Sequence, residues 1–199
     1  ISQLAAEDRC HLNGIALKDG QVRFVTTVGQ TDIVNGWRDR RQDGGCVIDL
    51  AEERIIAQGL SMPHSPRWYR DRLWLLNSGT GEFGYIEAET GIFKALVFCP
   101  GYLRGCAFID NYAVVGISQL RNKTFSGLPL DEKLRQSGTE SFCGLLIIDL
   151  AQCIIVLWLK LEGVVKELYD VVILPQIRRP MALGFKSDEI KRLITIDRL

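Results

Sequence analysis

Seven polar or aromatic residues stand at matching places in four short stretches of the chain, and their types suit the binding of a polar or anionic ligand. They are His11, Asn13, His64, Ser65, Arg104, Tyr169 and Asp170. Each lies at or beside the start of a repeated phrase, in which a polar or glycine-bearing step precedes an apolar run: LNGIAL, HSPRWY, LRGCAF and LYDVVI. A few convergent polar groups of this kind orient a ligand in a pocket. We therefore expect these residues to form one ligand-binding site.

The same residues have structural and metal-binding alternatives. Asn13 and Asp170 suit hydrogen bonds to turn backbones, and Arg104 suits an ion pair with Asp170. In a catalytic alternative, His11, His64 and Asp170 would supply three ligands to a divalent metal ion and leave one position open for water.

The elements that position these residues are predicted from the repeat. Residues 13–60, 65–98 and 104–161 each contain four apolar strands joined by polar or glycine-bearing turns. A fourth copy begins with strands predicted at 168–174 and 180–185 and then stops. The third strand of each complete copy ends in an acid: Asp49, Glu87 and Asp149. Such internal repetition is typical of one supersecondary unit placed beside copies of itself.

Four-stranded antiparallel sheets in series are the blades of a β-propeller, an all-β fold whose first strands line a central channel. The sequence predicts a single propeller-like domain over residues 1–199 with about three and a half blades, and a β-sandwich is the alternative. So few blades would leave strand edges unpaired. Together with the absence of an initiator methionine, this leads us to expect the C-terminal part of a longer protein, or a homodimer formed through an exposed blade edge.

The connections predict which face of the molecule carries function. In a propeller, the loop that joins the second and third strands of a blade lies on the same face as the connection from one blade to the next. The two enlarged loops, 27–45 and 118–142, both join a second strand to a third, so we expect function on that face. Residues 121–132 have a composition suited to a lid. The candidate residues of this loop rim are Trp37, Arg38, Asn77, Arg121 and Lys123.

Charge and hydropathy exclude several classes of partner. The chain has 24 basic and 24 acidic residues, so no net field attracts nucleic acid or an anionic membrane. Residues 144–163 are as long as a bilayer helix, but Asp149, Gln152 and Lys160 interrupt them, and we expect a buried hairpin instead. The six cysteines form no CxxC pair, which favours free thiols in a reducing, cytoplasmic compartment.

Several longer strings carry a family resemblance. GLSMPHSPRWY, LWLLNSGTGEFGY, FCPGYLRG, NKTFSGLPLD, EGVVKELYDV and RRPMALGFK resemble a bacterial conserved-hypothetical family, a domain of unknown function common in cyanobacteria and sometimes joined to tetratricopeptide repeats. Members of that family are longer at the N-terminus. The resemblance implies a fold group and names no reaction.

We expect a cytoplasmic propeller domain that binds a polar small molecule or a peptide at the channel face. One alternative is a metal-assisted hydrolase or lyase of the lactonase-like propeller type, although the metal ligands of those proteins resemble Glu, Asn and Asp. Another is a protein-interaction platform that uses the loop rim. A divalent metal ion is the cofactor that the catalytic alternative requires.

Overall fold

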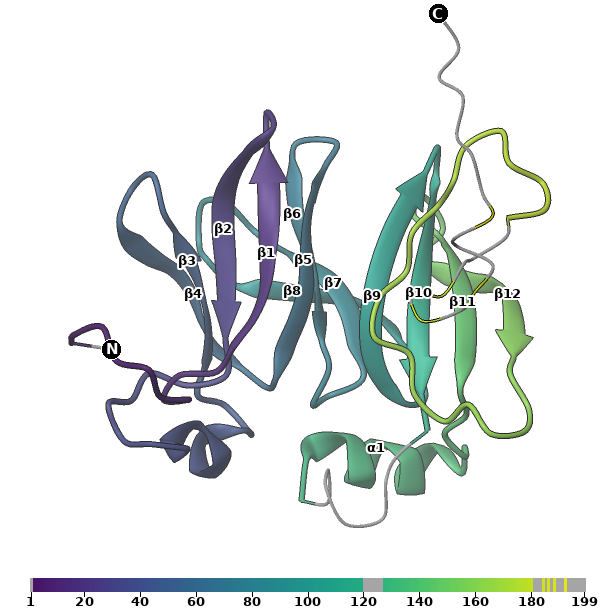
Figure 1. The fold of residues 1–199 in the computed structure, drawn as a ribbon. Helices are drawn as coiled ribbons and strands as arrows, with labels where there is room; N and C mark the ends of the chain where they lie inside the picture. The colour runs from purple at the N-terminus through teal and green to yellow at the C-terminus, as the bar shows by residue number, and fades with distance from the viewer. Residues whose placement is uncertain are drawn as a thin grey trace, which may run out of the picture.

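A computed structural model describes residues 2–119 and 127–180, together with the single positions 184, 186, 188 and 192. Within these residues the chain forms twelve β-strands in three four-stranded antiparallel sheets, one α-helix and one short 3-10 helix. Successive strands pair in chain order within each sheet (Figure 1). The prediction of an all-β fold built from four-stranded units is confirmed.

The twelve strands follow the predicted boundaries to within a few residues. The first sheet contains β1 (Leu12–Lys18), β2 (Gln21–Thr27), β3 (Gly45–Asp49) and β4 (Arg54–Leu60). The second contains β5 (Pro63–Tyr69), β6 (Arg72–Asn77), β7 (Glu82–Ile86) and β8 (Phe93–Phe98). The third contains β9 (Tyr102–Ile109), β10 (Tyr112–Ser118), β11 (Gly144–Asp149) and β12 (Ile154–Lys160).

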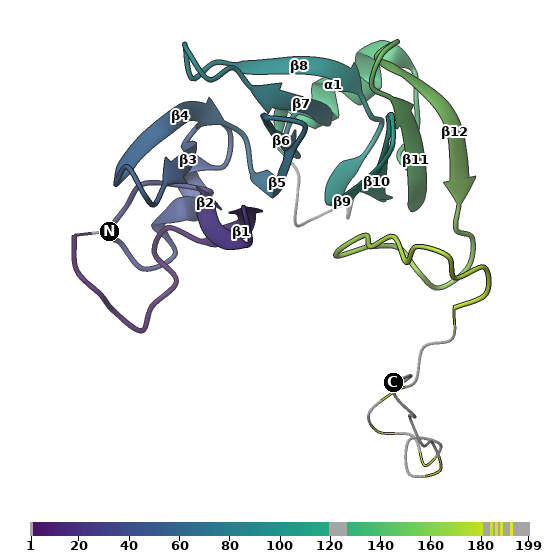
Figure 2. The same cartoon turned by 90° about the horizontal axis from the view of Figure 1, so that it is seen from above.

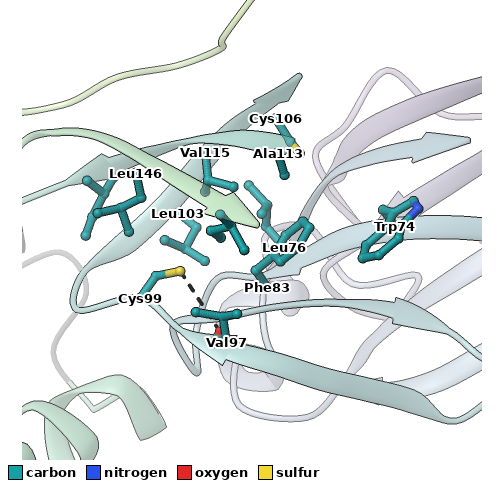
Figure 3. Packing of buried hydrophobic residues seen from close by; sticks show 12 residues of the cluster. Trp74, Leu76, Phe83, Val97, Cys99, Leu103, Cys106, Ala113, Val115 and Leu146 are labelled. Atoms are coloured by element: carbon teal, nitrogen blue, oxygen red, sulfur yellow. Dashed lines mark hydrogen bonds between the residues drawn. The ribbon is translucent and has the colours of Figure 1, made fainter. Parts of the chain in front are cut away.

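The three sheets lie side by side along an arc that is open on one side (Figure 2). Their first strands are neighbours, because β1 lies beside β5 and β5 lies beside β9. Alternate residues of β6 point to opposite faces, so Leu73 and Leu75 pack toward the first sheet while Trp74 and Leu76 pack toward the third. The cluster between the second and third sheets is shown in Figure 3. Burial of these two apolar layers holds the sheets together.

The acid that ends the third strand caps the turn that follows it. The Asp49 carboxylate accepts hydrogen bonds from the backbone N–H groups of Ala51 (3.0 Å) and Glu52 (3.1 Å) and from the Arg23 guanidinium (2.7 Å). Asp149 caps its own turn in the same way through the two corresponding N–H groups. A shared turn geometry therefore explains why this acid recurs in the sequence.

Replacing Asp49 with alanine should lower the free energy of unfolding by about 2–3 kcal/mol, because a buried carboxylate with three donors is lost and those donors are left unpaired. Urea denaturation measures this loss. Glu87→Ala is the matched control, since Glu87 stands at the same place in the second sheet but bonds only the Thr90 hydroxyl and Lys94. Equal losses in the two variants would contradict the turn-capping explanation.

The enlarged loop before β11 contains a helix that was not predicted from the sequence. Helix α1 (Pro129–Ser137) begins with a proline in its first turn and ends at Gly138, whose φ of 62° closes the helix. Leu130 and Leu134, one turn apart, are buried against the loop end of the sheets. A proline in the first turn, a glycine at the end and two apolar residues one turn apart are ordinary helix signals, but here they occur within a long loop.

The predicted fourth copy does not form its first strand. Residues 168–174 are irregular, and most of the second predicted strand, 180–185, lies outside the described residues. In the three complete copies the first strand pairs with the second strand of its own copy, and the described residues supply no such partner for 168–174. The segment still follows the third sheet, because the Leu168 N–H donates to the Ser118 hydroxyl oxygen (3.0 Å).

The segment that was weighed as a membrane span is a hairpin, as predicted, but its second strand is not buried. β11 and β12 pair in antiparallel register, and most of β12 is exposed to solvent. No helix among the described residues has the length and apolar character needed to cross a membrane.

Candidate functional site

The repeated phrase forms a β-bulge in the first strand of each sheet. The pairing register shifts at Asn13 in β1, at Ser65 and Pro66 in β5, and at Arg104 and Gly105 in β9. A bulge adds residues to one strand of a pair and redirects their side chains, and bulges occur often at functional sites. The repeated phrase therefore specifies a β-bulge as well as the strand that contains it.

Neighbouring bulges touch one another. A Cβ atom on Gly14 would lie 2.6 Å from Cδ of Pro66, so the first bulge lies directly against the second. The Ser65 hydroxyl accepts a hydrogen bond from the Gly105 N–H (2.9 Å), which joins the second bulge to the third. A Cβ atom on Gly105 would lie 2.4 Å from the backbone nitrogen of Val171. All four phrases thus form one row, although the fourth is not a strand.

His64 and Tyr102 form a buried neutral pair in this row. His64 is 7% exposed, and its Nε2 atom lies 2.9 Å from the Tyr102 hydroxyl. Burial, together with the nearby positive charge of Arg104, lowers the pKa of His64 from 6.5 to about 3. Burial also raises the pKa of the Tyr102 hydroxyl, against the opposing effect of Arg104. Both side chains are therefore uncharged at neutral pH.

Arg104 is a partly buried cation without a carboxylate partner. Its guanidinium carbon lies 5.5 Å from the ring centre of Tyr102 and 5.1 Å from that of Tyr169. Its Nε atom is buried and has no hydrogen-bond acceptor, and no ion pair of the described residues includes it. The expected pair between Arg104 and Asp170 is wrong, because Asp170 instead accepts from the Arg67 guanidinium at 3.0 Å. The Arg104 guanidinium hydrogen-bonds the Tyr102 hydroxyl and otherwise faces the two aromatic rings.

Asn13 supplies a second buried donor without a partner. Its Nδ2 atom is inaccessible to solvent and finds no acceptor, while its backbone hydrogen-bonds the His64 ring. Leaving a buried polar atom unpaired costs about 1–3 kcal/mol, so such atoms call for a functional or structural explanation. Asn13 and Arg104 occupy equivalent bulge positions, and both are donors. The arrangement suits a ligand that accepts hydrogen bonds.

His11 lies at the edge of this row in a cluster with one aromatic neighbour, a carboxylate and an arginine. The His11 Nδ1 atom lies 3.0 Å from the Asp8 carboxylate, which also accepts from the Trp37 indole N–H at 2.8 Å. The His11 and Trp37 rings stack with centres 4.2 Å apart. The guanidinium carbon of Arg38 lies 4.4 Å from the Trp37 ring centre. Trp37 is itself buried, so this part of the rim presents Arg38 and the half-exposed His11 ring.

Other rim candidates have different surroundings. Asn77 is buried, and its side-chain oxygen accepts from the Ser61 N–H at 2.7 Å, so it holds the chain between β4 and β5 and does not line the rim. The hydroxyl of Ser65 is engaged by Gly105. Arg121 and Lys123 lie outside the described residues, as does the whole first half of the expected lid, residues 121–126.

The expected metal site does not form. His11 pairs with Asp8, His64 with Tyr102, and Asp170 with Arg67. In the described part of the chain, no group of three or more histidine, cysteine and acidic side chains gathers as metal ligands. The residues named for a metal ion are separated by contacts that the sequence did not reveal.

Three residues of the site were missed by sequence reasoning. Tyr102, Arg67 and Asp8 contact Arg104, Asp170 and His11 respectively. Tyr102 directly precedes the third phrase and Arg67 lies inside the second, so the repeat placed both near the site. Asp8 follows no pattern that predicts its role.

Two cavities lie away from this row of bulges. One of about 480 Å³ lies beside β12 and includes Phe142, Trp158 and Lys166, and one of about 460 Å³ lies between the first two sheets and includes Arg23 and Trp68. We place the candidate site at Arg104, because its guanidinium forms no ion pair among the described residues, whereas Arg23 in the second cavity, whose Nε atom also lacks an acceptor, is paired with Asp49 and Glu52.

The fold and the row of bulges define an all-β protein built from repeated four-stranded sheets. The chain belongs to the family described as a domain of unknown function (DUF4915), whose model matches residues 1–183. This confirms membership of a domain-of-unknown-function family, while the narrower cyanobacterial family remains a prediction.

Other comparisons add little. Among solved structures the chain is similar to the computationally designed Ika4 protein, with 12% identity, a TM-score of 0.48, and coverage of 83% of this chain and 81% of that chain. No curated protein matches this chain.

Proposed function

We propose that the three sheets are consecutive blades of a β-propeller and that the protein binds a polar small molecule or peptide where their first strands begin. The arc of sheets and the adjacency of β1, β5 and β9 support the propeller, since propeller blades place their first strands around a channel. The free thiols fit a reducing compartment, and we propose the cytoplasm.

The observation that carries the binding proposal is the state of Arg104. An arginine that is partly removed from water ordinarily has a carboxylate or another set of acceptors, because desolvating a guanidinium is costly. Two tyrosine rings and the hydrogen bond to the Tyr102 hydroxyl supply only part of that compensation. A carboxylate or phosphate group of a ligand would satisfy the guanidinium, and a further acceptor of the ligand would satisfy the unpaired donor of Asn13.

His64 contributes by remaining neutral. A protonated imidazole next to Arg104 would place two repelling charges side by side, and burial prevents this at neutral pH. The hydrogen bond to Tyr102 holds the ring in place. His64 therefore orders the wall of the site, and Arg104 and Asn13 provide the contacts to the ligand.

Arg104→Ala should weaken the binding of small anions by about tenfold or more, because the charge-assisted contacts are lost. Calorimetry and NMR titration with inorganic phosphate and with citrate measure this. Arg72→Ala is the matched control: Arg72 also lies over a tyrosine ring, with its guanidinium carbon 4.5 Å from the ring centre of Tyr85, but it belongs to the other end of the sheets. The proposal fails if neither anion binds the unaltered protein or if both variants bind equally.

A further inference from the structure

The cavity of about 480 Å³ beside β12 lies on the inner face of the third sheet. Leu146 and Ile155 line it, and both pack into the apolar cluster between the second and third sheets. A further sheet packed beside the third would cover the opposite face, where Leu157 and Leu159 lie next to their β11 partners. The cavity is therefore a separate feature from the outer face of the arc.

A β-bulge in β12 brings the apolar side chains of this cavity together. Residues three apart in a regular strand point to opposite faces, which would separate Ile155 from Trp158. The pairing register shifts between the partners of Ile147 and Ile148, and Val156 is the extra residue of the bulge. As a result Ile155 and Trp158 share the face that lines the cavity.

Trp158 forms an open aromatic wall of the cavity. It is 66% exposed, whereas Trp37 and Trp74 are buried and Trp68 is partly buried. The Phe142 ring meets the Trp158 indole at a steep angle, with ring centres 6.3 Å apart. Two rings in this arrangement leave room for a third ring to pack against the indole face, and burying an exposed indole contributes a large apolar area. The wall therefore suits an aromatic ligand.

The mouth of the cavity carries a cation that has no carboxylate partner among the described residues. Lys160 and Lys166 both line the cavity, but the Lys160 ammonium lies 3.6 Å from the Glu162 carboxylate and Lys166 forms no such pair. The other acid of the lining, Glu140, is exposed to solvent. Of the two lysines, only Lys166 is left to pair with a ligand.

The positive charge of Lys166 reaches the inner wall of the cavity. Burial raises the pKa of the Cys143 thiol, which lines that wall, and Lys166 lowers it against the smaller opposing effect of Glu167. Neither of the acids that line the cavity affects this thiol. A negative group held next to the apolar wall would therefore meet the field of Lys166.

We propose that this cavity binds a small aromatic carboxylic acid, whose ring packs against Trp158 and Phe142 and whose carboxylate lies beside Lys166. A volume of about 480 Å³ is within the range of small-molecule pockets, about 300–1,000 Å³, in which apolar walls surround a few polar groups. The ligand differs from the one proposed at Arg104, because here the apolar wall provides most of the contact area.

Cinnamate and cinnamyl alcohol test the role of the charge, since they share a ring and differ in the carboxylate. We expect cinnamate to bind the 199-residue chain about threefold more tightly than the alcohol, the effect of one partly solvated ion pair. Lys166→Gln should remove this difference. Lys160→Gln is the matched control and should keep it, because Lys160 is already paired with Glu162. Calorimetry measures all four affinities.

Trp158→Ala tests the aromatic wall and should weaken the binding of both compounds about tenfold. Leu157→Ala is the matched control, because Leu157 is as exposed as Trp158 but lies on the opposite face of the same strand. NMR titration should shift the indole N–H resonance of Trp158, which is identified by its loss in Trp158→Ala. Circular dichroism establishes that both variants keep their sheets.

The proposal is overturned if neither compound shifts the Trp158 resonance up to its solubility limit, or if Leu157→Ala weakens binding as much as Trp158→Ala. An alcohol that binds as tightly as the acid overturns the assignment of an acidic ligand. Equal losses of cinnamate affinity in Lys160→Gln and Lys166→Gln overturn the placement of the carboxylate.

Discussion

Replacing Gly105 with alanine should lower the free energy of unfolding by about 3 kcal/mol and detach residues 168–171 from the third sheet. Gly105 has a φ of 81°, in the left-handed region that a side chain disfavours. An alanine Cβ would lie 2.4 Å from the nitrogen of Val171 and 2.5 Å from the carbonyl carbon of Asp170. Both contacts are with backbone, which cannot turn aside as a flexible side chain can. The segment must therefore move.

Gly59→Ala separates backbone strain from the clash. Gly59 has a φ of 74°, close to that of Gly105, but a Cβ atom there would meet nothing within 4 Å. We expect Gly59→Ala to cost only about 1 kcal/mol, the strain of the left-handed conformation. Urea denaturation compares the two variants, and limited proteolysis between residues 161 and 180 reports detachment. If the two variants lose equal stability and residues 161–180 resist proteolysis equally in both, the position of the fourth phrase does not depend on the bulge at Gly105.

The detachment also bears on the candidate site. Tyr169 lies over the Arg104 guanidinium, and Asp170 pairs with Arg67. Moving this segment would remove one aromatic face from Arg104 and deprive Arg67 of its carboxylate partner. The same small residue therefore governs both the packing of the fourth phrase and the environment of the proposed ligand contact.

The second large effect is a loss of stability in acid that comes from His64. Because the pKa of His64 is about 3 in the folded protein and near 6.5 when the residue is exposed, the unfolded chain binds a proton over this range that the folded chain does not. The contribution of the neutral His64 ring to the free energy of unfolding is fully present above about pH 6.5 and is lost as the pH falls toward 3. The total loss is about 4–5 kcal/mol, at roughly 1.4 kcal/mol for each pH unit.

Comparing His64→Gln with His11→Gln isolates this effect. Glutamine can keep a hydrogen bond to Tyr102 but does not titrate, so His64→Gln should flatten the fall in unfolding free energy between pH 6.5 and 3. His11 contributes only a smaller part of the lowering of the His64 pKa, so its replacement should reduce that slope much less than His64→Gln does. Denaturant titrations at several pH values measure both. Parallel curves for the wild type and His64→Gln would show that His64 is protonated as easily in the folded state as in the unfolded chain.

The strands were predictable because their signals are local. Alternating or continuous apolar runs bounded by polar turns specify strands within a few residues, and the repeat confirmed each pattern by comparison with the others. The acid at the end of the third strand was visible for the same reason, since Asp49 and Asp149 bond N–H groups only two and three residues away. Helix α1 also has local sequence signals, a proline in its first turn (Pro129) and a glycine at its end (Gly138), so it too was predictable from the sequence.

The partners within the site were not predictable in this way. Arg104 and Asp170 occupy the third and fourth copies of the phrase, which suggested an ion pair, yet Arg67 from the second copy reaches Asp170 instead. His64, expected in contact with ligand, is buried against Tyr102. Such pairings depend on how far each bulge rotates its side chains and on which sheet packs beside it. Neither of these can be predicted from the spacing of residues along the chain.

The sequence by itself therefore determined the repeating sheets, their turns and the end of the molecule where the polar residues of the phrase lie, because these follow from short-range patterns of apolar and turn-forming residues. Only the tertiary structure decided that Arg104 lies between tyrosine rings without a carboxylate, that the metal-ligand candidates are separated, and that β12 presents an apolar edge. These features depend on packing between sheets, where residues distant in sequence compete for the same partners and burial decides which of them remain charged.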